Sequence, residues 1–288
     1  MDINILSKIS EVNSKDWNLI NFDEHPFTSY EFLSSLEESK TVCAKTGWQP
    51  QHIIIKQNNK VVGAIPIYLK GHSYGEYVFD HSWANAYEKA GGNYYPKLIS
   101  AIPFTPVNGP RFLYNLKFKN QIIEEISKTI KNLTINNNLS SAHINFLSND
   151  HKEILTSNNW IKRMGLQFHW ENNRYQSFNE FLFQLKSHKR KMIKKEREYL
   201  QKLDISIVKL TGDDLTSSVW DKFYSFYLDT IDRKWGGAYL NREFFELISE
   251  KMSSKILLII SKKDNDIIAG ALNFIGNDKL FGRNWGSK

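Results

Sequence analysis

The stretch IIIKQNNKVVGAI, from Ile53 to Ile65, predicts a β-hairpin and decides the fold class. Two runs of β-branched and small apolar residues flank Asn58 and Asn59, and asparagine tolerates the positive φ of a tight hairpin turn. The stretch LIISKKDNDIIAGAL, from Leu258 to Leu272, has the same pattern, with residues 264–266 at its turn. A hairpin of this kind therefore occurs twice in the chain.

Two further elements precede each hairpin in the same order. Strand-like alternation over Asp2–Leu6 recurs over Asp204–Val208, and a short amphipathic helix over Glu31–Glu38 recurs over Glu243–Glu250. Each of these patterns is common on its own. Three of them in one order at a nearly constant spacing predict a duplicated domain.

The remaining predicted elements extend both copies. In the first copy we expect strands over Tyr74–Asp80, Arg111–Tyr114, Ala142–Leu147 and Leu166–Trp170, and helices over Lys119–Asn132 and His151–Asn158. A long helix is expected over Phe178–Lys202, and the second copy adds helices over Val219–Lys234 and Arg242–Met252 and a strand over Lys279–Trp285. This order of elements is that of the GNAT acyltransferase fold.

We therefore expect an α/β fold, layered as in α+β proteins, with two GNAT-like domains in tandem. The domains are residues 1–172 and 204–288, joined by a basic linking helix in residues 173–203. The second copy stops after its third strand, which would leave a sheet edge unpaired and an apolar face uncovered. We expect this domain to be truncated at its C-terminal side, and the sequence to be a fragment.

Composition and charge are those of an ordinary globular chain with one basic segment. The 288 residues are 41% hydrophobic, and the longest aliphatic run, Ile256–Ile260, is far shorter than the roughly 20 residues that cross a bilayer. A single cysteine, Cys43, allows no internal disulfide, and the N-terminus shows no signal peptide, so a cytoplasmic protein is expected. Most of the formal charge of +7 comes from Lys186–Glu198, which holds seven Lys or Arg and two Glu.

Five segments are more specific than these patterns. They are TGWQPQH (46–52), SYGEYVFDHSWANAYEKAGGNYYPKL (73–98), PFTPVNGPR (103–111), TIDRKWGGAYLNREFF (230–245) and AGALNFIGNDKLFGRNWG (269–286). These segments resemble the FemAB-like family of N-acyltransferases and span nearly the whole chain. The resemblance implies a tandem GNAT fold and an enzyme that moves an acyl or aminoacyl group onto an amine; several relatives use aminoacyl-tRNA and peptidoglycan precursors.

Direct acyl transfer needs a base for the acceptor amine but no nucleophilic side chain, so Cys43 is expected to be structural. In the predicted strand, alternation places Glu76 and Asp80 on one face about 13 Å apart, so at most one of them is the base. His81 follows directly, and the imidazole group of histidine is in general suited to proton transfer at about pH 7. We expect Asp80 or His81 to be the base. The alternative is that Asp80 caps the next helix and His81 packs at the strand end.

Aromatic and basic residues around this strand are candidates for substrate binding. Five aromatic side chains either line a groove for a peptide or sugar acceptor or belong to the core: Tyr77, Trp83, Tyr87, Tyr94 and Tyr95. Lys97 and Arg111 are candidates for contact with a phosphate or carboxylate, or else form a solvated surface pair. Arg283 and Trp285 lie on the equivalent strand of the second copy and would join a site shared between the domains.

Two other motifs have more than one interpretation. Residues 233–238, RKWGGA, match the pattern with which GNAT enzymes hold the pyrophosphate of acyl-CoA, but they follow a predicted helix rather than a strand. Arg233 and Trp235 are therefore expected to be structural or substrate contacts. On the basic segment, a helical stripe either holds the backbone of tRNA or a diphosphate or simply faces solvent: Lys189, Arg190, Lys194 and Arg197. No metal-binding spacing is apparent.

The sequence thus favours an N-acyltransferase with an amine-bearing acceptor that resembles a peptide or a cell-wall precursor. The donor is aminoacyl-tRNA or acyl-CoA, used as a co-substrate, and no tightly bound cofactor is expected. The alternative function is a catalytically silent protein that holds RNA or an anionic ligand through its basic helix and a cleft.

Overall fold

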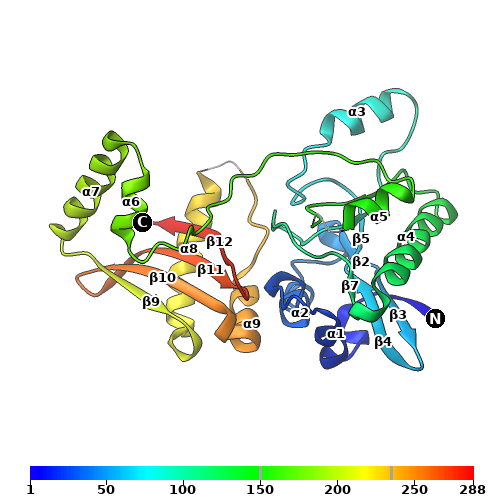
Figure 1. Cartoon of the computed structure of the whole chain (residues 1–288), viewed down its shortest axis with the longest axis horizontal. Coiled ribbons are helices and arrows are strands. Elements are labelled where there is room, and N and C mark those ends of the chain that lie inside the picture. The colour runs from blue at the N-terminus through cyan, green and yellow to red at the C-terminus, as the bar shows by residue number, and fades with distance from the viewer. Residues whose placement is uncertain (149–150, 234–235) are drawn as a thin grey trace.

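The chain folds into a mixed α/β structure, which confirms the predicted fold class (Figure 1). The computed structural model describes residues 1–148, 151–233 and 236–288. The described strands form three sheets of four strands, two in the first half of the chain (residues 1–158) and one in the second half (residues 206–288). Among the described helices, none has the length and apolar character that crossing a bilayer requires.

The first predicted hairpin lies at the centre of an antiparallel sheet. β3 (His52–Gln57) and β4 (Lys60–Ile65) pair through the expected two-asparagine turn, whose φ values are 50° and 62°. β1 (Asp2–Leu6) pairs with β3, and β7 (Leu113–Tyr114) pairs with β4. The strand order is therefore β1-β3-β4-β7.

Both faces of this hairpin are buried because helices cover each of them. Ile54 packs in a core that includes side chains of α1 (Ser14–Ile20) and α2 (Tyr30–Glu38). Its neighbour Ile53 points to the other face and packs in a core with α4 (Lys119–Asn136). α4 confirms the helix expected from Lys119 and extends beyond Asn132.

A second sheet in the first half was largely missed by the sequence. Its strands are β2 (Trp48–Pro50), β5 (Tyr68–Lys70), β6 (Lys97–Ser100) and β8 (Ala142–Ile144), in the order β2-β5-β6-β8. Only β8 lies where a strand was predicted. β6 and β8 are parallel, and the other pairs are antiparallel. Two helices belong to this region, α3 (His81–Lys89) and α5 (Lys152–Ser157), of which α5 was expected.

The second half repeats the plan of the first sheet. β9 (Ser206–Leu210), β10 (Ile256–Lys263), β11 (Asp266–Ile275) and β12 (Leu280–Ser287) form an antiparallel sheet in that order. The β10–β11 turn has φ values of 48° and 63°. The register of each hairpin also shifts at one place near the turn, after Ile55 in β3 and after Ser261 in β10.

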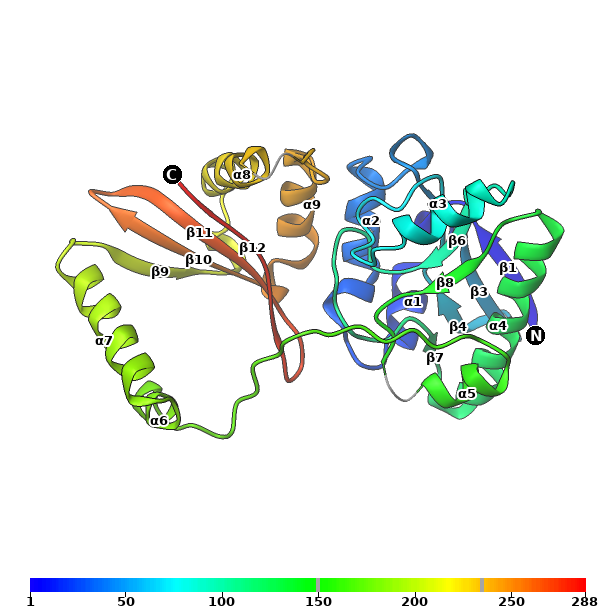
Figure 2. The same cartoon turned by 90° about the horizontal axis from the view of Figure 1, so that it is seen from above.

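Helices of the two halves pack directly on each other. In the sequence, α8 (Ser217–Asp232) and α9 (Arg242–Met252) come between β9 and β10. In space, α9 lies beside α2 in both views (Figures 1 and 2). The Phe32 and Phe244 rings meet edge to face at this contact, 5.8 Å apart. Buried side chains of both halves therefore belong to one continuous core.

Two predictions between the halves are wrong. The expected long helix is two helices, α6 (Phe178–Gln184) and α7 (Ser187–Gln201), because Leu185 adopts an extended conformation. The expected strand over Leu166–Trp170 has no regular structure and is largely exposed, with Phe168 91% accessible. Its alternating pattern is present, but no neighbouring strand pairs with it in the described residues. The segment crosses from one half to the other (Figure 1).

Candidate functional site

A buried ion cluster lies at the start of β6. The Lys97 ammonium donates hydrogen bonds to Glu76 Oε2 at 2.9 Å, to Asp80 Oδ2 at 2.5 Å and to Ser73 Oγ at 2.9 Å. The Lys97 side chain is fully buried, and both carboxylate side chains are 1% exposed. One cation therefore holds three polar groups of the loop Ser73–Asp80.

This arrangement corrects the sequence prediction for Tyr74–Asp80. The segment is a loop rather than a strand, and Gly75 and Tyr77 have φ values of 79° and 55°. The chain therefore curls back, and both carboxylates reach the same ammonium instead of lying about 13 Å apart. The predicted separation of the two carboxylates is therefore wrong, whereas the prediction that at most one of them is the base stays a prediction.

Two tyrosines complete the cluster. The Tyr94 hydroxyl donates to Asp80 Oδ2 at 2.8 Å, and the Tyr95 hydroxyl shares a 2.8 Å hydrogen bond with Ser73 Oγ. The sequence left open whether Tyr94 lines a groove or belongs to the core. Tyr94 is 5% exposed and therefore lies in the interior. The two tyrosine hydroxyl groups thus give Asp80 and Ser73 hydrogen-bond partners inside the protein.

The two carboxylates differ in their readiness to accept a proton. Burial opposes ionisation of Asp80, but hydrogen bonds from Lys97 and Tyr94 outweigh it and lower its pKa to about 2. For Glu76, burial is the larger effect and raises the pKa, although the Lys97 charge offsets part of it. Glu76 Oε1 and Asp80 Oδ1 are both buried without a hydrogen-bond partner in the described structure. Each carboxylate thus keeps one oxygen for a further donor.

Lys70, which the sequence analysis did not single out, extends the cluster. It ends β5 and is fully buried, with its ammonium 3.8 Å from the centroid of the Trp48 ring. Its best hydrogen bond goes to the Tyr74 carbonyl at 3.2 Å. Burial lowers the pKa of Lys70 to about 7, with the charges of Glu76 and Asp80 opposing this shift. In the sequence, Lys70 stands out only as a lysine that follows a short apolar stretch.

Exposed aromatic side chains cover the loop and α3. We call them the aromatic surface; they are Tyr74, Tyr77, Phe79, Trp83 and Tyr87, with exposed fractions from 45% to 76%. The Arg163 guanidinium lies over the Trp83 ring at 4.8 Å and donates to the Phe79 carbonyl at 3.0 Å. Exposed aromatic side chains can stack with a ligand, and at Trp83 the Arg163 guanidinium already covers one face of the ring.

His81 and Asp80 do not fit the alternative of a cap and a packed histidine. Asp80 precedes α3, but its side chain makes no capping hydrogen bond; its Oδ2 accepts from Lys97 and Tyr94 instead. His81 is the first residue of α3 and is exposed, with its ring 6.3 Å from that of Tyr74. It lies at the rim of the aromatic surface.

Two predicted arginines, Arg111 just before β7 and Arg283 on β12, donate hydrogen bonds to one loop, residues 104–107. Arg111 is fully buried and donates to the Val107 carbonyl at 2.6 Å, and burial lowers its pKa to about 9. Arg283, from the second half, donates to the Phe104 carbonyl at 3.2 Å and to Thr105 Oγ1 at 2.9 Å. Neither forms an ion pair with a described residue. Arg111 is therefore interior rather than a surface contact.

The loop held by these arginines leads back to the ion cluster. The Phe104 amide donates to the Gly75 carbonyl at 3.1 Å, next to Glu76. The Phe104 ring stacks on Tyr239 of the second half, 4.9 Å apart. A continuous path of contacts thus joins Arg283 to the carboxylate loop.

The other predicted contact residues make no hydrogen bond or ion pair with the cluster in the described structure. Lys189 and Arg190 are on α7, which lies beside α6 at the end of the molecule opposite the first half (Figure 1). Arg233 is the exposed residue at the end of α8, after a helix as expected, and Trp235 lies outside the described residues. Trp285, on β12, is 68% exposed. The structure does not bring these four groups together with Glu76.

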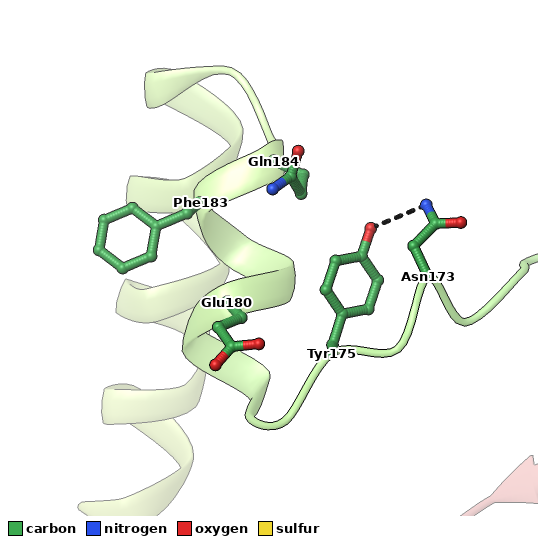
Figure 3. A pocket seen from close by; sticks show the side chains of 5 residues that line it. All are labelled: Asn173, Tyr175, Glu180, Phe183 and Gln184. Carbon is green, nitrogen blue, oxygen red and sulfur yellow. Dashed lines mark hydrogen bonds between the residues drawn. The ribbon is translucent and has the colours of Figure 1, made fainter.

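A cavity of about 350 Å³ lies beside α6, and its lining includes Tyr175 and Phe183 (Figure 3). Asn173 donates to the Tyr175 hydroxyl at 3.2 Å on one side, and Glu180 and Gln184 of α6 lie on the other (Figure 3). It contains none of the residues predicted for the site. Within the described residues, no group of three or more His, Cys, Asp and Glu is arranged to hold a metal ion.

Comparison with known proteins assigns the family. The sequence model of the FemAB-like family, described as peptidoglycan biosynthesis/recognition, matches residues 8–288. A solved structure titled "Crystal structure of FemX" has a TM-score of 0.54 and 11% sequence identity over 100% of this chain and 81% of that chain, so it shows a common fold. None of the curated proteins matches the sequence. The chain therefore belongs to the FemAB-like family, and its enzyme class is acyltransferase.

Proposed function

We propose that the chain transfers an acyl or aminoacyl group directly onto an amine, with the loop Ser73–Asp80 at the reacting centre. The observation that carries this proposal is the pair of buried carboxylates on Lys97, each with one oxygen left without a partner. An acceptor amine needs a proton acceptor and an anchor, and these two oxygens supply both. The FemAB-like membership supports the reaction class.

Glu76 is the better base of the two carboxylates. Its raised pKa makes it a stronger proton acceptor than Asp80, whose pKa of about 2 keeps it ionised and weakly basic. In the proposed step the amine nitrogen attacks the acyl carbonyl carbon, an amide bond forms, and the ester or thioester bond of the donor breaks. Glu76 takes the proton of the amine and returns it to the leaving oxygen or sulfur. His81, exposed at the rim, is the second candidate for this role.

Substrate can reach Glu76 only if the loop opens, because the residue is 3% exposed. Such a movement would have to break the hydrogen bonds that Lys97 donates to Glu76 and Asp80. The aromatic surface lies on the same loop and on α3, where it would receive a peptide or sugar portion of the acceptor. We infer that acceptor binding and loop opening occur together.

The donor and the acceptor are proposed from chemistry and family. Aminoacyl-tRNA or acyl-CoA serves as the donor, and Lys189 and Arg190 of α7 offer positive charge for the backbone of tRNA. The family description supports an acceptor related to peptidoglycan precursors. Both substrate classes are consistent with a cytoplasmic enzyme, which we propose as the location. Cys43 takes no part, because its thiol donates to the Lys40 carbonyl at 3.5 Å.

We also propose that the halves arose by duplication of one GNAT-like domain. Equal strand order, equal turn geometry and a register shift at matching places in both hairpins support this. We keep the domain limits 1–172 and 204–288, with the helices of residues 173–203 between them. The pseudo-equivalent helices α2 and α9 then face each other across the contact between the domains.

Label transfer tests the function. The whole chain is incubated with radiolabelled aminoacyl-tRNA or acyl-CoA and a peptidoglycan-precursor peptide, and labelled amide product is measured. We expect transfer from one donor, and loss of about two orders of magnitude or more in Glu76→Gln. Glu88→Gln, an exposed change on α3, is the matched control and retains full activity. Absence of transfer from both donors, or an active Glu76→Gln variant, contradicts the proposal.

A further inference from the structure

Phe104 is held in a backbone conformation that is uncommon for residues other than glycine. Its φ is 57°, in the left-handed region, where the β-carbon of an L-residue comes close to a backbone carbonyl oxygen. A conformation of this kind persists only where the surroundings fix it by several contacts, and such residues cluster at functional sites. The contacts of Phe104 therefore indicate what its strain serves.

The second half of the chain supplies two of the contacts that fix Phe104. Arg283 Nη2 donates to the Phe104 carbonyl at 3.2 Å and to Thr105 Oγ1 at 2.9 Å. The Tyr239 ring stacks on the Phe104 ring, with 4.9 Å between centroids and 11° between planes. The Phe104 amide in turn donates to the Gly75 carbonyl at 3.1 Å. Two residues of the second half thus hold a residue that holds the loop Ser73–Asp80.

The contact between Phe104 and Gly75 is close. A β-carbon at Gly75, whose φ is 79°, would lie 2.6 Å from the Phe104 ring. Glu76 comes next in the chain, and its Oε2 accepts from Lys97 at 2.9 Å. Tyr77, on the other side of Glu76, is left-handed as well, with a φ of 55°. A shift of Phe104 would therefore move the backbone that sets the direction of the Glu76 side chain.

Arg283 is a cation without a carboxylate partner among the described residues. Its guanidinium donates to the loop and to Asn284 Oδ1, and burial lowers its pKa. The two halves already share an apolar core, and a buried charge without an anion opposes stability. A guanidinium adds direction, because its planar donors fix the orientation of the groups that they bind.

We propose that Arg283 is a positioning residue for Glu76. It holds Phe104 in the left-handed conformation, Phe104 holds Gly75, and the backbone at Gly75 directs the Glu76 carboxylate. In this role Arg283 contacts neither the substrate nor the reacting atoms. The inference rests on the proposed function, in which Glu76 is the base. Direct contact of Arg283 with substrate is the competing interpretation.

Hydrogen exchange followed by mass spectrometry tests the structural step without any substrate. In Arg283→Gln, the amides of residues 73–80 and 101–107 should exchange about tenfold faster than in the wild type, because the contact between Phe104 and Gly75 opens more often. Residues 119–136 of α4 should be unchanged. Lys279→Gln removes the same charge from an exposed residue next to β12 and is the matched control. Unchanged exchange in residues 73–80 of Arg283→Gln overturns the proposal.

The label-transfer assay tests the functional step. We expect kcat of Arg283→Gln to fall about ten- to a hundredfold with KM unchanged, because a displacement of about 1 Å at a reacting group is enough for such a loss. Arg283→Lys keeps a donor and should recover part of the rate. A raised KM at unchanged kcat would assign Arg283 to substrate binding and overturn the positioning role.

A double variant separates this inference from the proposed function. If Arg283 acts through Glu76, then Arg283→Gln has little further effect on kcat in the Glu76→Gln background. An equal fold loss in both backgrounds overturns the positioning role and leaves Glu76 as the base. A fully active Glu76→Gln variant removes the base, and the proposed function with it.

Discussion

Phe32 and Phe244 meet edge to face across the two halves, 5.8 Å between ring centroids, and both side chains are fully buried. They occupy the helices α2 and α9, which recur in the same place in each half. This pair is one of several aromatic contacts between the two halves, which share a core.

Removal of either ring should therefore weaken the whole molecule. We expect Phe32→Ala to lower the free energy of unfolding by about 3–5 kcal/mol, because a buried phenyl ring is replaced by a cavity. Phe79→Ala, which removes an exposed ring, should change it by less than about 0.5 kcal/mol. Urea unfolding followed by circular dichroism measures both. Equal stability of the two variants would contradict the shared core.

Asp80 should make the protein sensitive to acid. Its pKa falls from 3.8 to about 2 in the folded state, so its ionised form stabilises the fold at pH values above 3.8, and this contribution is lost as the pH falls toward about 2. Thermal melts between about pH 5 and pH 2 should show a steeper loss of stability in the wild type than in Asp80→Asn. Asp16→Asn, on an exposed turn of α1, serves as the control and should follow the wild type.

Lys70 should make the stability of the protein depend on pH above about pH 7. Because burial lowers its pKa from 10.5 to about 7, the unfolded chain binds a proton that the folded chain lacks between these values. Stability contributed by this group therefore rises as the pH increases from about 7 to about 9. Lys70→Met should remove that rise, whereas Lys60→Gln, an exposed change on β4, should preserve it. Parallel melting curves for wild type and Lys70→Met would refute the assignment.

Gly63 is required by close packing on α4. A β-carbon at this position would overlap the Ile122 side chain, so Gly63→Ala should cost about 1–3 kcal/mol of stability. Gly71→Ala meets no atom within 4 Å and should be nearly neutral. Denaturant midpoints distinguish the two. A neutral Gly63→Ala would mean that α4 can shift away from the sheet at little cost.

The sequence predicted the elements whose signals are local. The hairpins followed from apolar runs around Asn or Asp turns, and α4, α8 and α9 followed from helical spacing. Leu166–Trp170 shows the limit of this approach, because alternation reports a suitable pattern but says nothing of a partner strand. The loop Ser73–Asp80 alternates as well, yet left-handed conformations at Gly75 and Tyr77 fold it back.

The candidate site was only partly predictable for a related reason. Glu76, Asp80 and Lys97 were each named as candidates, but their meeting depends on the pairing of β5 with β6, which brings distant parts of the chain together. Lys70 was missed because its neighbours come from the same long-range pairing. Its low pKa is a property of burial, and a residue's burial at a strand end cannot be read from spacing alone.

Two hydrogen bonds at Phe104 connect the second half to the loop that carries the proposed base, Glu76. Arg283 holds the Phe104 carbonyl, and the amide of the same residue holds Gly75, one position before Glu76. Both halves of the chain therefore contribute to the position of the backbone next to Glu76, through two hydrogen bonds that meet at one residue.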